Sequence, residues 1–342
     1  MTTQLNQIGD IPPGLLNVGA RELHTVLPGP TLMHLPGRRE APLFVSVLLH
    51  GNEDSGLSAI QQVLRRYHSR ELPRALSVFF GNVDAAAHGL RVLEGQPDYN
   101  RVWPGGEAPD SPERRLMTEV VEAMRARGVF ASIDVHNNTG LNPHYACINR
   151  LDHRFMQLAA LFGRTVVYFI RPRGVQSMAM AELCPATTLE CGKPGVAAGA
   201  EHAAEFIEAS LNLADIPDHA VAPQDIDLFH TVATVKIPER FSFSFEPGAA
   251  DIAFEPEIDH YNFRELYAGT RFAALRPDSI ARLEAHDEDG RDVTERFFSH
   301  VDGHITLTRP SMPSMLTLDP RIVRQDCLCY LMERLTAPLS DQ

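Results

Sequence analysis

The chain has 342 residues, of which 44% are hydrophobic and 22% are charged. These shares are close to those of soluble globular proteins and exclude a disordered or fibrous chain. The formal net charge is -13, and a field of this sign repels nucleic-acid phosphates and anionic lipid. We therefore expect a small-molecule anionic substrate, held by local arginines, and no nucleic-acid or membrane partner.

Cysteine usage and the N-terminus bear on the compartment. The five cysteines are few, scattered and odd in number, which favours reduced thiols over a disulfide framework. Residues 1–14 lack the basic flank and apolar core of a signal peptide, and no apolar run approaches the roughly 20 residues of a membrane span. We expect a cytoplasmic protein, and the sequence leaves open whether it forms a homo-oligomer.

The first part of the chain alternates strands and helices. The apolar run 43–49 predicts a strand buried on both faces, and helical spacing follows over 58–67. Asp110 begins a helix signal that leads into 116–127. Further strands are expected at 75–80, 129–135, 145–149, 165–170 and 186–189, and further helices at 153–162 and 200–213. This alternation predicts an α/β fold with a mixed, mostly parallel sheet flanked by helices.

The character of the chain changes after about Pro217. Strand-like segments dominate from Thr231 onward, and helix is nearly absent; these segments are TVATVKI, FSFSF, RFAAL and HITLTR. Turn signals separate them, at Glu246-Pro247-Gly248, Asp289-Gly290 and Asp302-Gly303. We predict two domains, residues 1–217 and a smaller β-rich domain of residues 218–342.

Three metal-ligating side chains follow predicted strands. His50 and Glu53 come directly after one buried strand, and His136 comes directly after another. Ligand sites in open α/β sheets form outside the carboxyl ends of strands, so we expect the three to converge. Two imidazoles and a carboxylate are a common zinc ligand set in hydrolases, and Asp134 is placed to orient His136. On spacing alone, a capped helix start at His50 and Glu53 is the simpler interpretation.

Four short segments carry the polar residues that are candidates for a site. They are HGNE (50–53), DYNR (98–101), DVHNNTG (134–140) and TLECG (188–192). In order and approximate spacing they resemble the succinylglutamate desuccinylase and aspartoacylase family, which is related to the zinc carboxypeptidases. The resemblance extends over about residues 43–195. It implies a zinc-exopeptidase-like fold whose β-rich C-terminal domain partly covers the catalytic cleft.

The resemblance also implies a metal and a base. It assigns one zinc ion per chain to His50, Glu53 and His136, and it makes Glu190 the general base that activates the zinc-bound water. One carboxylate beside the metal can accept the proton of the water and then protonate the leaving nitrogen. The alternative for Glu190 is a carboxylate that caps the turn at Gly192.

Further likenesses concern the substrate. Asn100 and Arg101 resemble the family's substrate-binding pair, and a guanidinium suits a carboxylate because it offers two parallel hydrogen bonds. Arg91 is similar to a catalytic arginine that supports the carbonyl, although an exposed arginine at a helix end is the alternative. Tyr267 faintly resembles a tyrosine of the site. Asn137 is expected to line the cleft, with turn formation as an equal alternative.

One position departs from the family pattern. Aspartoacylase-like members carry a second carboxylate-binding arginine about ten residues before the catalytic glutamate, where this chain has Met178 and Met180. Methionines more naturally line a pocket for a less acidic side chain, although buried packing methionines are the alternative. This departure argues against N-acetylaspartate as the substrate.

These observations predict a zinc-dependent amidohydrolase that acts on linear amides. The expected substrate is a small N-acyl amino acid or related N-acyl amine. A zinc carboxypeptidase acting on short peptides is the first alternative, since it would share the metal site. A non-catalytic binding module that keeps the fold is the second alternative, and the presence of Glu190 argues against it.

Overall fold

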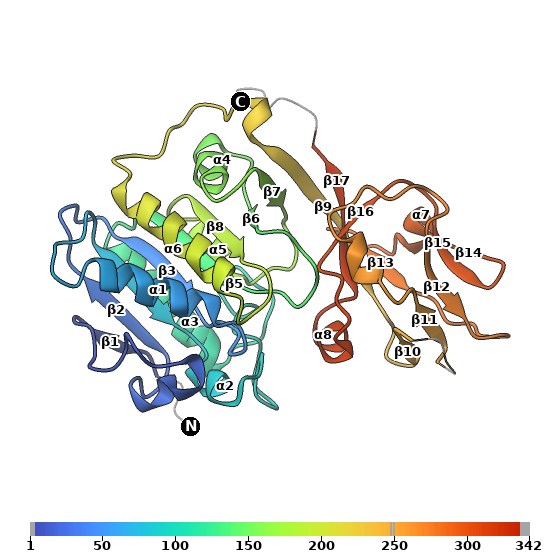
Figure 1. The fold of residues 1–342 in the computed structure, drawn as a ribbon, viewed down its shortest axis with the longest axis horizontal. Coiled ribbons are helices and arrows are strands. Elements are labelled where there is room, and N and C mark those ends of the chain that lie inside the picture. Colours follow the sequence, from blue (N-terminus) through green and yellow to red (C-terminus); the bar gives the residue numbers. More distant parts are fainter. Residues whose placement is uncertain (1–3, 247, 249, 336–342) are drawn as a thin grey trace. The chain divides into compact units, whose positions relative to one another are not determined.

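The computed structural model describes residues 4–246, 248 and 250–335 (Figure 1). They divide into two compact units, one of residues 4–137 and 144–227, the other of residues 138–143 and 228–335. These bounds differ from the expected division into residues 1–217 and 218–342. That division into domains stays a prediction.

The first unit is built on one mixed sheet. Its strand order is β1-β2-β4-β3-β5-β8-β6-β7. Neighbouring strands run parallel except for the antiparallel pairs β2–β4 and β6–β8. The strands are β1 Asn6–Ile8, β2 Thr31–Leu35, β3 Leu43–Val47, β4 Leu76–Phe80, β5 Ala131–His136, β6 Tyr145–Ile148, β7 Thr165–Tyr168 and β8 Ala186–Glu190. The expected mixed, mostly parallel sheet is confirmed.

Helices cover this sheet, and α1 packs against α6 (Figure 1). The helices are α1 Ser55–Arg66, α2 Val83–His88, α3 Pro112–Ala126, α4 His153–Ala160, α5 Gln176–Met180 and α6 Ala197–Asn212, with 3-10 turns at Ala20–Thr25 and Pro223–Asp225. The signal near Asp110 corresponds to α3, but Ser111 is the cap, because its extended backbone lets its hydroxyl accept from Arg114 N–H at 3.1 Å. The short α2 and α5 were not expected, since neither is long enough to show helical periodicity.

The central strands explain the apolar runs. Every residue of β3, β4, β5 and β8 is buried, as expected for parallel strands covered on both faces. The run 43–49 is longer than its strand because Leu48 has a positive φ of 56°, a conformation that a branched side chain seldom adopts. The chain therefore leaves the sheet after Val47, and the next residues form the loop that carries His50.

The second unit is β-rich, as expected. Its strands form two groups, ordered β13-β9-β17-β16 and β10-β11-β12-β15-β14. The strands are β9 Asp227–Lys236, β10 Phe243–Ser244, β11 Ile252–Phe254, β12 Arg271–Leu275, β13 Glu284–His286, β14 Phe298–Val301, β15 His304–Leu307, β16 Met312–Ser314 and β17 Cys329–Arg334. Helical structure is limited to α7 Thr294–Phe297, α8 Pro320–Gln325 and a 3-10 turn at Ile258–Tyr261.

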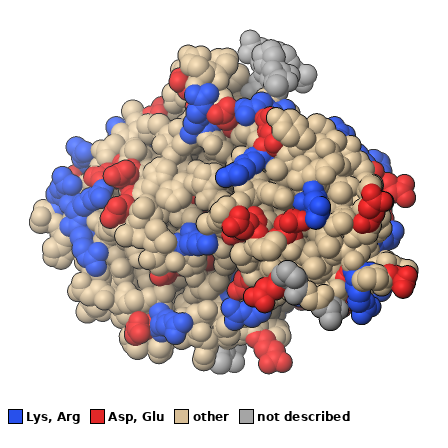
Figure 2. Space-filling model, turned by 45° about the vertical axis from the view of Figure 1, so that its right-hand side comes forward, with Lys and Arg blue, Asp and Glu red and all other residues tan. Residues whose placement is uncertain are grey.

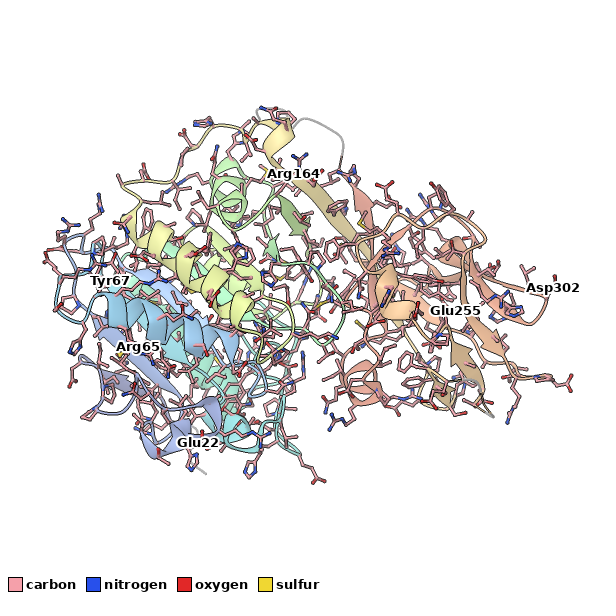
Figure 3. The ribbon with its side chains drawn as sticks, in the orientation of Figure 1. Glu22, Arg65, Tyr67, Arg164, Glu255 and Asp302 are labelled. Carbon is pink, nitrogen blue, oxygen red and sulfur yellow. The ribbon has the colours of Figure 1, made fainter. Side chains whose placement is uncertain are left out.

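Turn chemistry shapes this unit. Asp302 lies in the turn between β14 and β15 (Figure 3). Asp302 and Gly303 both have positive φ, 49° and 74°, the pattern of a two-residue turn that matches the twist of a hairpin. The Asp-Gly signal therefore marks a real hairpin, whose closing pair is Val301 and His304.

The surface carries both signs of charge. On the face that Figure 2 presents, basic and acidic side chains are interspersed. Within the described part of the chain, no helix is long and apolar enough to cross a membrane. The expected absence of nucleic-acid and membrane partners stays a prediction.

Candidate functional site

The candidate site lies at the carboxyl ends of three adjacent strands of the first unit. His50 follows β3, His136 is the last residue of β5, and Glu190 is the last residue of β8. Since β3, β5 and β8 are neighbours and run parallel, their ends meet at one edge of the sheet. The tertiary structure therefore brings together residues that are far apart in the sequence.

His50, Glu53 and His136 form one buried cluster. Glu53 Oε1 lies 2.8 Å from His50 Nδ1, and Glu53 Oε2 lies 2.7 Å from His136 Nδ1. One ligand atom from each residue can be chosen so that all three lie within 4.8 Å of one another. The side chains are at most 6% exposed. The three predicted ligands thus point their donor atoms at a common place.

Carboxylates hold the far side of both imidazoles. Asp98 Oδ1 lies 3.0 Å from His50 Nε2, and Asp134 Oδ2 lies 2.8 Å from His136 Nε2. Ser46 in turn donates to Asp134 Oδ1 at 2.7 Å. A carboxylate behind a histidine fixes its tautomer so that the other ring nitrogen presents a lone pair. Both Nδ1 atoms are therefore directed toward the place that Glu53 faces.

The charges in the cluster shift each other's pKa values. Burial opposes ionisation of Glu53, but attraction to His50 and His136 outweighs it and lowers the pKa of this carboxyl group. Burial likewise lowers the pKa of His136, but Asp134 and Glu53 outweigh it and hold that pKa well above its ordinary value. The pKa of His50 is raised because Glu53 and Asp98 outweigh burial and Arg91. The site thus attracts positive charge, which two protons or one divalent cation can supply.

The donor set fits a zinc ion. Two imidazole nitrogens and a carboxylate are the ligands of many catalytic zinc sites. The paired carboxylates behind the imidazoles are the outer partners that such ligands usually have. The described residues therefore include a buried His/Glu/His cluster that could hold a metal ion.

Glu190 lies beside the cluster. It pairs with His136 in the register between β5 and β8, and paired residues of adjacent strands lie about 4.8 Å apart on the same face of the sheet. Its side chain is buried, 7% exposed. Glu190 also raises the pKa of Cys147, where its charge adds to the larger effect of burial. A carboxylate in this position is able to exchange protons with a group bound at the cluster.

Arg91 and Asn100 contact the cluster and its neighbouring carboxylates. Arg91 donates to Asp98 Oδ2 from Nε at 3.2 Å and from Nη2 at 3.0 Å, while its Nη1 lies 3.9 Å from Glu53 Oε1. Asn100 Nδ2 lies 3.0 Å from His136 Nε2, and Asn100 Oδ1 accepts from Gln176 N–H at 2.8 Å. Both residues therefore support the cluster from behind, and their contacts with a substrate stay predictions.

Arg101 is half-buried. Its Nη1 donates to the carbonyl of Asn100 at 2.8 Å, and its charge helps to lower the pKa of Asp98, after the opposing effect of burial and the contributions of His50 and Arg91. Its guanidinium therefore lies near the cluster without being fully buried. Its role as an anion ligand stays a prediction.

The remaining predicted residues are placed as follows. Asn137 is 3% exposed and bonds to Ser55 and Gly192. Tyr267 is 80% exposed and belongs to the second unit. Met178 and Met180 lie on α5, and Met180 is fully buried, so it packs as a core side chain. The predicted substrate roles of Asn137 and Tyr267 are untested by these positions.

Asp98 was missed by the sequence analysis. It lies in the DYNR segment, two residues before Asn100, and its carboxylate joins His50 to Arg91. The sequence contained one usable signal, an acidic residue in a motif that also supplies Asn100 and Arg101. The pairing with His50 spans 48 positions, so only the folded chain reveals it.

Comparisons with known proteins agree with this geometry. The model of the succinylglutamate desuccinylase/aspartoacylase catalytic domain matches residues 42–216, half of the chain. No curated protein matches the chain.

Solved structures share the fold. A succinylglutamate desuccinylase from Chromobacterium violaceum is 18% identical with a TM-score of 0.57, covering 88% of this chain and 86% of that chain. A succinylglutamate desuccinylase/aspartoacylase from Rhodobacter sphaeroides is 14% identical with a TM-score of 0.59, covering 89% of each chain. Murine aminoacylase 3 is 13% identical with a TM-score of 0.51, covering 87% of this chain and 96% of that chain. By its matched domain, the chain belongs to the succinylglutamate desuccinylase/aspartoacylase family of amidohydrolases.

Proposed function

We propose that this protein is a zinc-dependent deacylase that cleaves the amide bond of a small N-acyl amino acid or related N-acyl amine. The observation that carries the proposal is the buried His50, Glu53 and His136 cluster, with Glu190 in register beside His136. His50, Glu53 and His136 would hold the ion. Membership of an amidohydrolase family supports the same chemistry.

The roles of the protein groups follow from their positions. When bound, zinc would polarise the amide carbonyl and lower the pKa of the attacking water. Glu190 accepts the proton that the water loses and returns it to the leaving nitrogen. Asp98 and Asp134 keep the two imidazoles in the orientation that presents Nδ1. The buried surroundings strengthen these electrostatic interactions because they exclude bulk water.

Arginines near the cluster account for an anionic substrate. Arg101 would bind a carboxylate of the substrate, because it lies next to the cluster and is only half-buried. Arg91 would support the developing oxyanion through the guanidinium edge that approaches Glu53. Asn100 and Tyr267 remain proposed substrate contacts. Of the two methionines on α5, Met180 packs in the core. The proposal of an amine product without a second acidic side chain therefore rests on the partly exposed Met178 and on the lack of an arginine at this position.

Names of similar structures support the substrate class. One of them is called a succinylglutamate desuccinylase, one a succinylglutamate desuccinylase/aspartoacylase and one aminoacylase 3. These names describe those proteins, and their low identities transfer only the fold. We therefore propose the shared class, N-acyl amino acids, and leave the acyl group to experiment.

The test combines metal analysis with a substrate panel. Purified protein should bind about one zinc per chain and hydrolyse at least one of the N-acetyl, N-succinyl or N-formyl amino acids. Glu190→Gln should lower kcat by about 10²–10⁴-fold and keep the zinc, because the change removes only the proton-accepting group. The matched control is Glu201→Gln, an exposed glutamate on α6, which should behave like wild type.

Several outcomes would contradict the proposal. Full activity of Glu190→Gln would overturn the proton-transfer role. Hydrolysis of dipeptides alone would replace the deacylase with a short-peptide carboxypeptidase. Zinc binding without hydrolysis of any panel member would favour a binding module. A protein that binds no zinc would overturn the metal centre.

A further inference from the structure

Asn137 connects the three loops that carry the cluster and Glu190. It directly follows His136, and its backbone N–H donates to Glu53 Oε2 at 3.1 Å. Its Oδ1 accepts from the backbone N–H of Ser55 at 3.2 Å. Its Nδ2 donates to Ser55 Oγ and to the carbonyl of Gly192, at 2.9 Å each. One side chain therefore bridges the start of α1 and the segment after β8.

The hydrogen-bonding capacity of this side chain is almost fully used. A carboxamide has two N–H donors and one carbonyl oxygen, and both donors of Asn137 have partners in the protein. Because Oδ1 faces an N–H group, only one orientation of the amide satisfies the three contacts. Asn137 is 3% exposed and Ser55 is 2% exposed, so water does not compete for these bonds. No N–H of Asn137 is left for a substrate.

The hydrogen bond from Asn137 Nδ2 to the Gly192 carbonyl depends on the conformation of that glycine. Gly192 has a φ of 71°, a conformation that other residues rarely adopt. A Cβ at this position would also lie 3.1 Å from His144 Nε2. The turn lies two residues after Glu190, so a bond to the Gly192 carbonyl restrains the segment that carries Glu190.

We propose that Asn137 is a positioning residue that fixes Glu190 and Glu53 relative to His136. The inference rests on the proposed function, since it assigns Glu190 and the cluster to one reaction. Reacting groups must be held in a near-attack geometry, and a displacement of about 1 Å can cost about 10²-fold in rate. A buried carboxamide that joins three loops supplies this restraint without contacting the substrate.

The central experiment is Asn137→Ala. We expect kcat to fall by about 10–100-fold with KM within about twofold of wild type, because the reacting groups are displaced while substrate binding persists. We also expect zinc affinity to fall by about 10-fold, the lower end of the effect of losing an outer partner of a metal site, because the change keeps the backbone N–H that donates to Glu53 and removes only the side-chain bonds of the bridge. Zinc affinity is measured by competition with a chelator, and rates are measured at saturating zinc.

Gln61→Ala is the matched control. Gln61 is also a buried carboxamide, and it lies within α1, where its Nε2 donates to the carbonyls of Leu15 at 2.8 Å and Val18 at 2.7 Å. Its loss should lower the melting temperature and leave kcat, KM and zinc affinity unchanged. Ser55→Ala removes one hydrogen bond of the bridge and should weaken zinc affinity about threefold, the scale of a single hydrogen bond.

The outcomes separate three roles. A raised KM with unchanged kcat in Asn137→Ala would make Asn137 a substrate ligand and overturn the proposal. A lower melting temperature alone, as in Gln61→Ala, would reduce its role to folding and also overturn it. If Asn137→Ala does not fold, unchanged zinc affinity in Ser55→Ala would contradict the bridge. Zinc affinity needs no substrate, so it tests the bridge even if wild type hydrolyses no N-acyl amino acid.

Discussion

The strand ends of the first unit and the core of the second unit use buried polar groups differently. The first unit gathers five buried ionisable residues in one place, with His50, Glu53, Asp134, His136 and Glu190 all at most 7% exposed. Its buried Arg74 lies elsewhere and donates to backbone carbonyls. The described core of the second unit is built largely from apolar side chains, with Asp259 as its buried carboxylate. Burying charge costs desolvation free energy. Charges kept buried at a shared sheet edge therefore indicate function, and an apolar core indicates packing.

Two asparagines make this contrast concrete. Asn137 in the first unit and Asn262 in the second are both buried, 3% and 6% exposed. Asn262 donates to the carbonyl of Leu316 and accepts from its N–H, both at 2.8 Å. Its side-chain amide thus pairs with the backbone of Leu316 as a neighbouring strand would. Asn137 instead joins loops that carry reactive groups. The same side chain is structural in one unit and, by our inference, positions catalytic groups in the other.

The largest expected effect on stability is in the apolar core of the second unit. Phe272 is fully buried against Phe298, with ring centroids 5.3 Å apart. Phe272→Ala should lower the free energy of unfolding by about 3–5 kcal/mol, because it removes a large apolar side chain and leaves a cavity. Urea unfolding measures the loss, with Ile280→Ala as the exposed control. A parallel fall in zinc affinity would show that the two regions are not separate in function.

Asn262→Ala should have an intermediate effect. The change leaves the N–H and the carbonyl of the buried Leu316 without their partner. The expected loss of stability is about 1–3 kcal/mol, the cost of unsatisfied buried polar groups. Calorimetry measures it, and zinc affinity should stay at the wild-type value. Weakened zinc binding like that expected for Asn137→Ala would remove the distinction between the two asparagines.

The smallest expected effect concerns a histidine of the first unit outside the cluster. Burial, with a smaller contribution from Arg127, lowers the pKa of His34 to about 4, whereas the pKa values of His50 and His136 are raised. Among the described residues His34 Nε2 has no hydrogen-bond partner, and Nδ1 lies 2.9 Å from Ser77 Oγ. A neutral imidazole is therefore favoured in the folded state.

The sign of the pH dependence follows from this shift. The unfolded state binds a proton near pH 6.5 and the folded state only near pH 4, so the contribution of His34 to stability is complete above pH 6.5. It is lost as the pH falls from 6.5 to 4. Partial exposure of His34 and solvent screening reduce the effect to less than about 1 kcal/mol. Unfolding of His34→Gln should depend less on pH over this range, and an identical pH profile would refute the assignment.

Much of the fold could be predicted from local patterns. The strand over β3 was expected because a continuous apolar run is typical of a strand covered on both faces. A turn at Asp302-Gly303 was expected because Asp-Gly is a turn signal, and the structure shows that this turn closes a hairpin. The exact end of β3 was not predictable, because the positive φ of Leu48 is imposed by the surrounding structure. Short helices such as α2 carry too few turns for a periodic pattern.

The sequence by itself supplied the candidate ligands His50, Glu53 and His136, because they follow apolar runs typical of buried strands and lie in motifs that resemble those of the family. Only the tertiary structure decided what surrounds them. Asp98 pairs with His50 Nε2, and Arg91 donates to Asp98. Asn137 donates to Ser55 and to the Gly192 carbonyl. These hydrogen bonds depend on which strands become neighbours. A contact such as that of Asn137 with Ser55, 82 positions apart, leaves no periodic trace in the sequence.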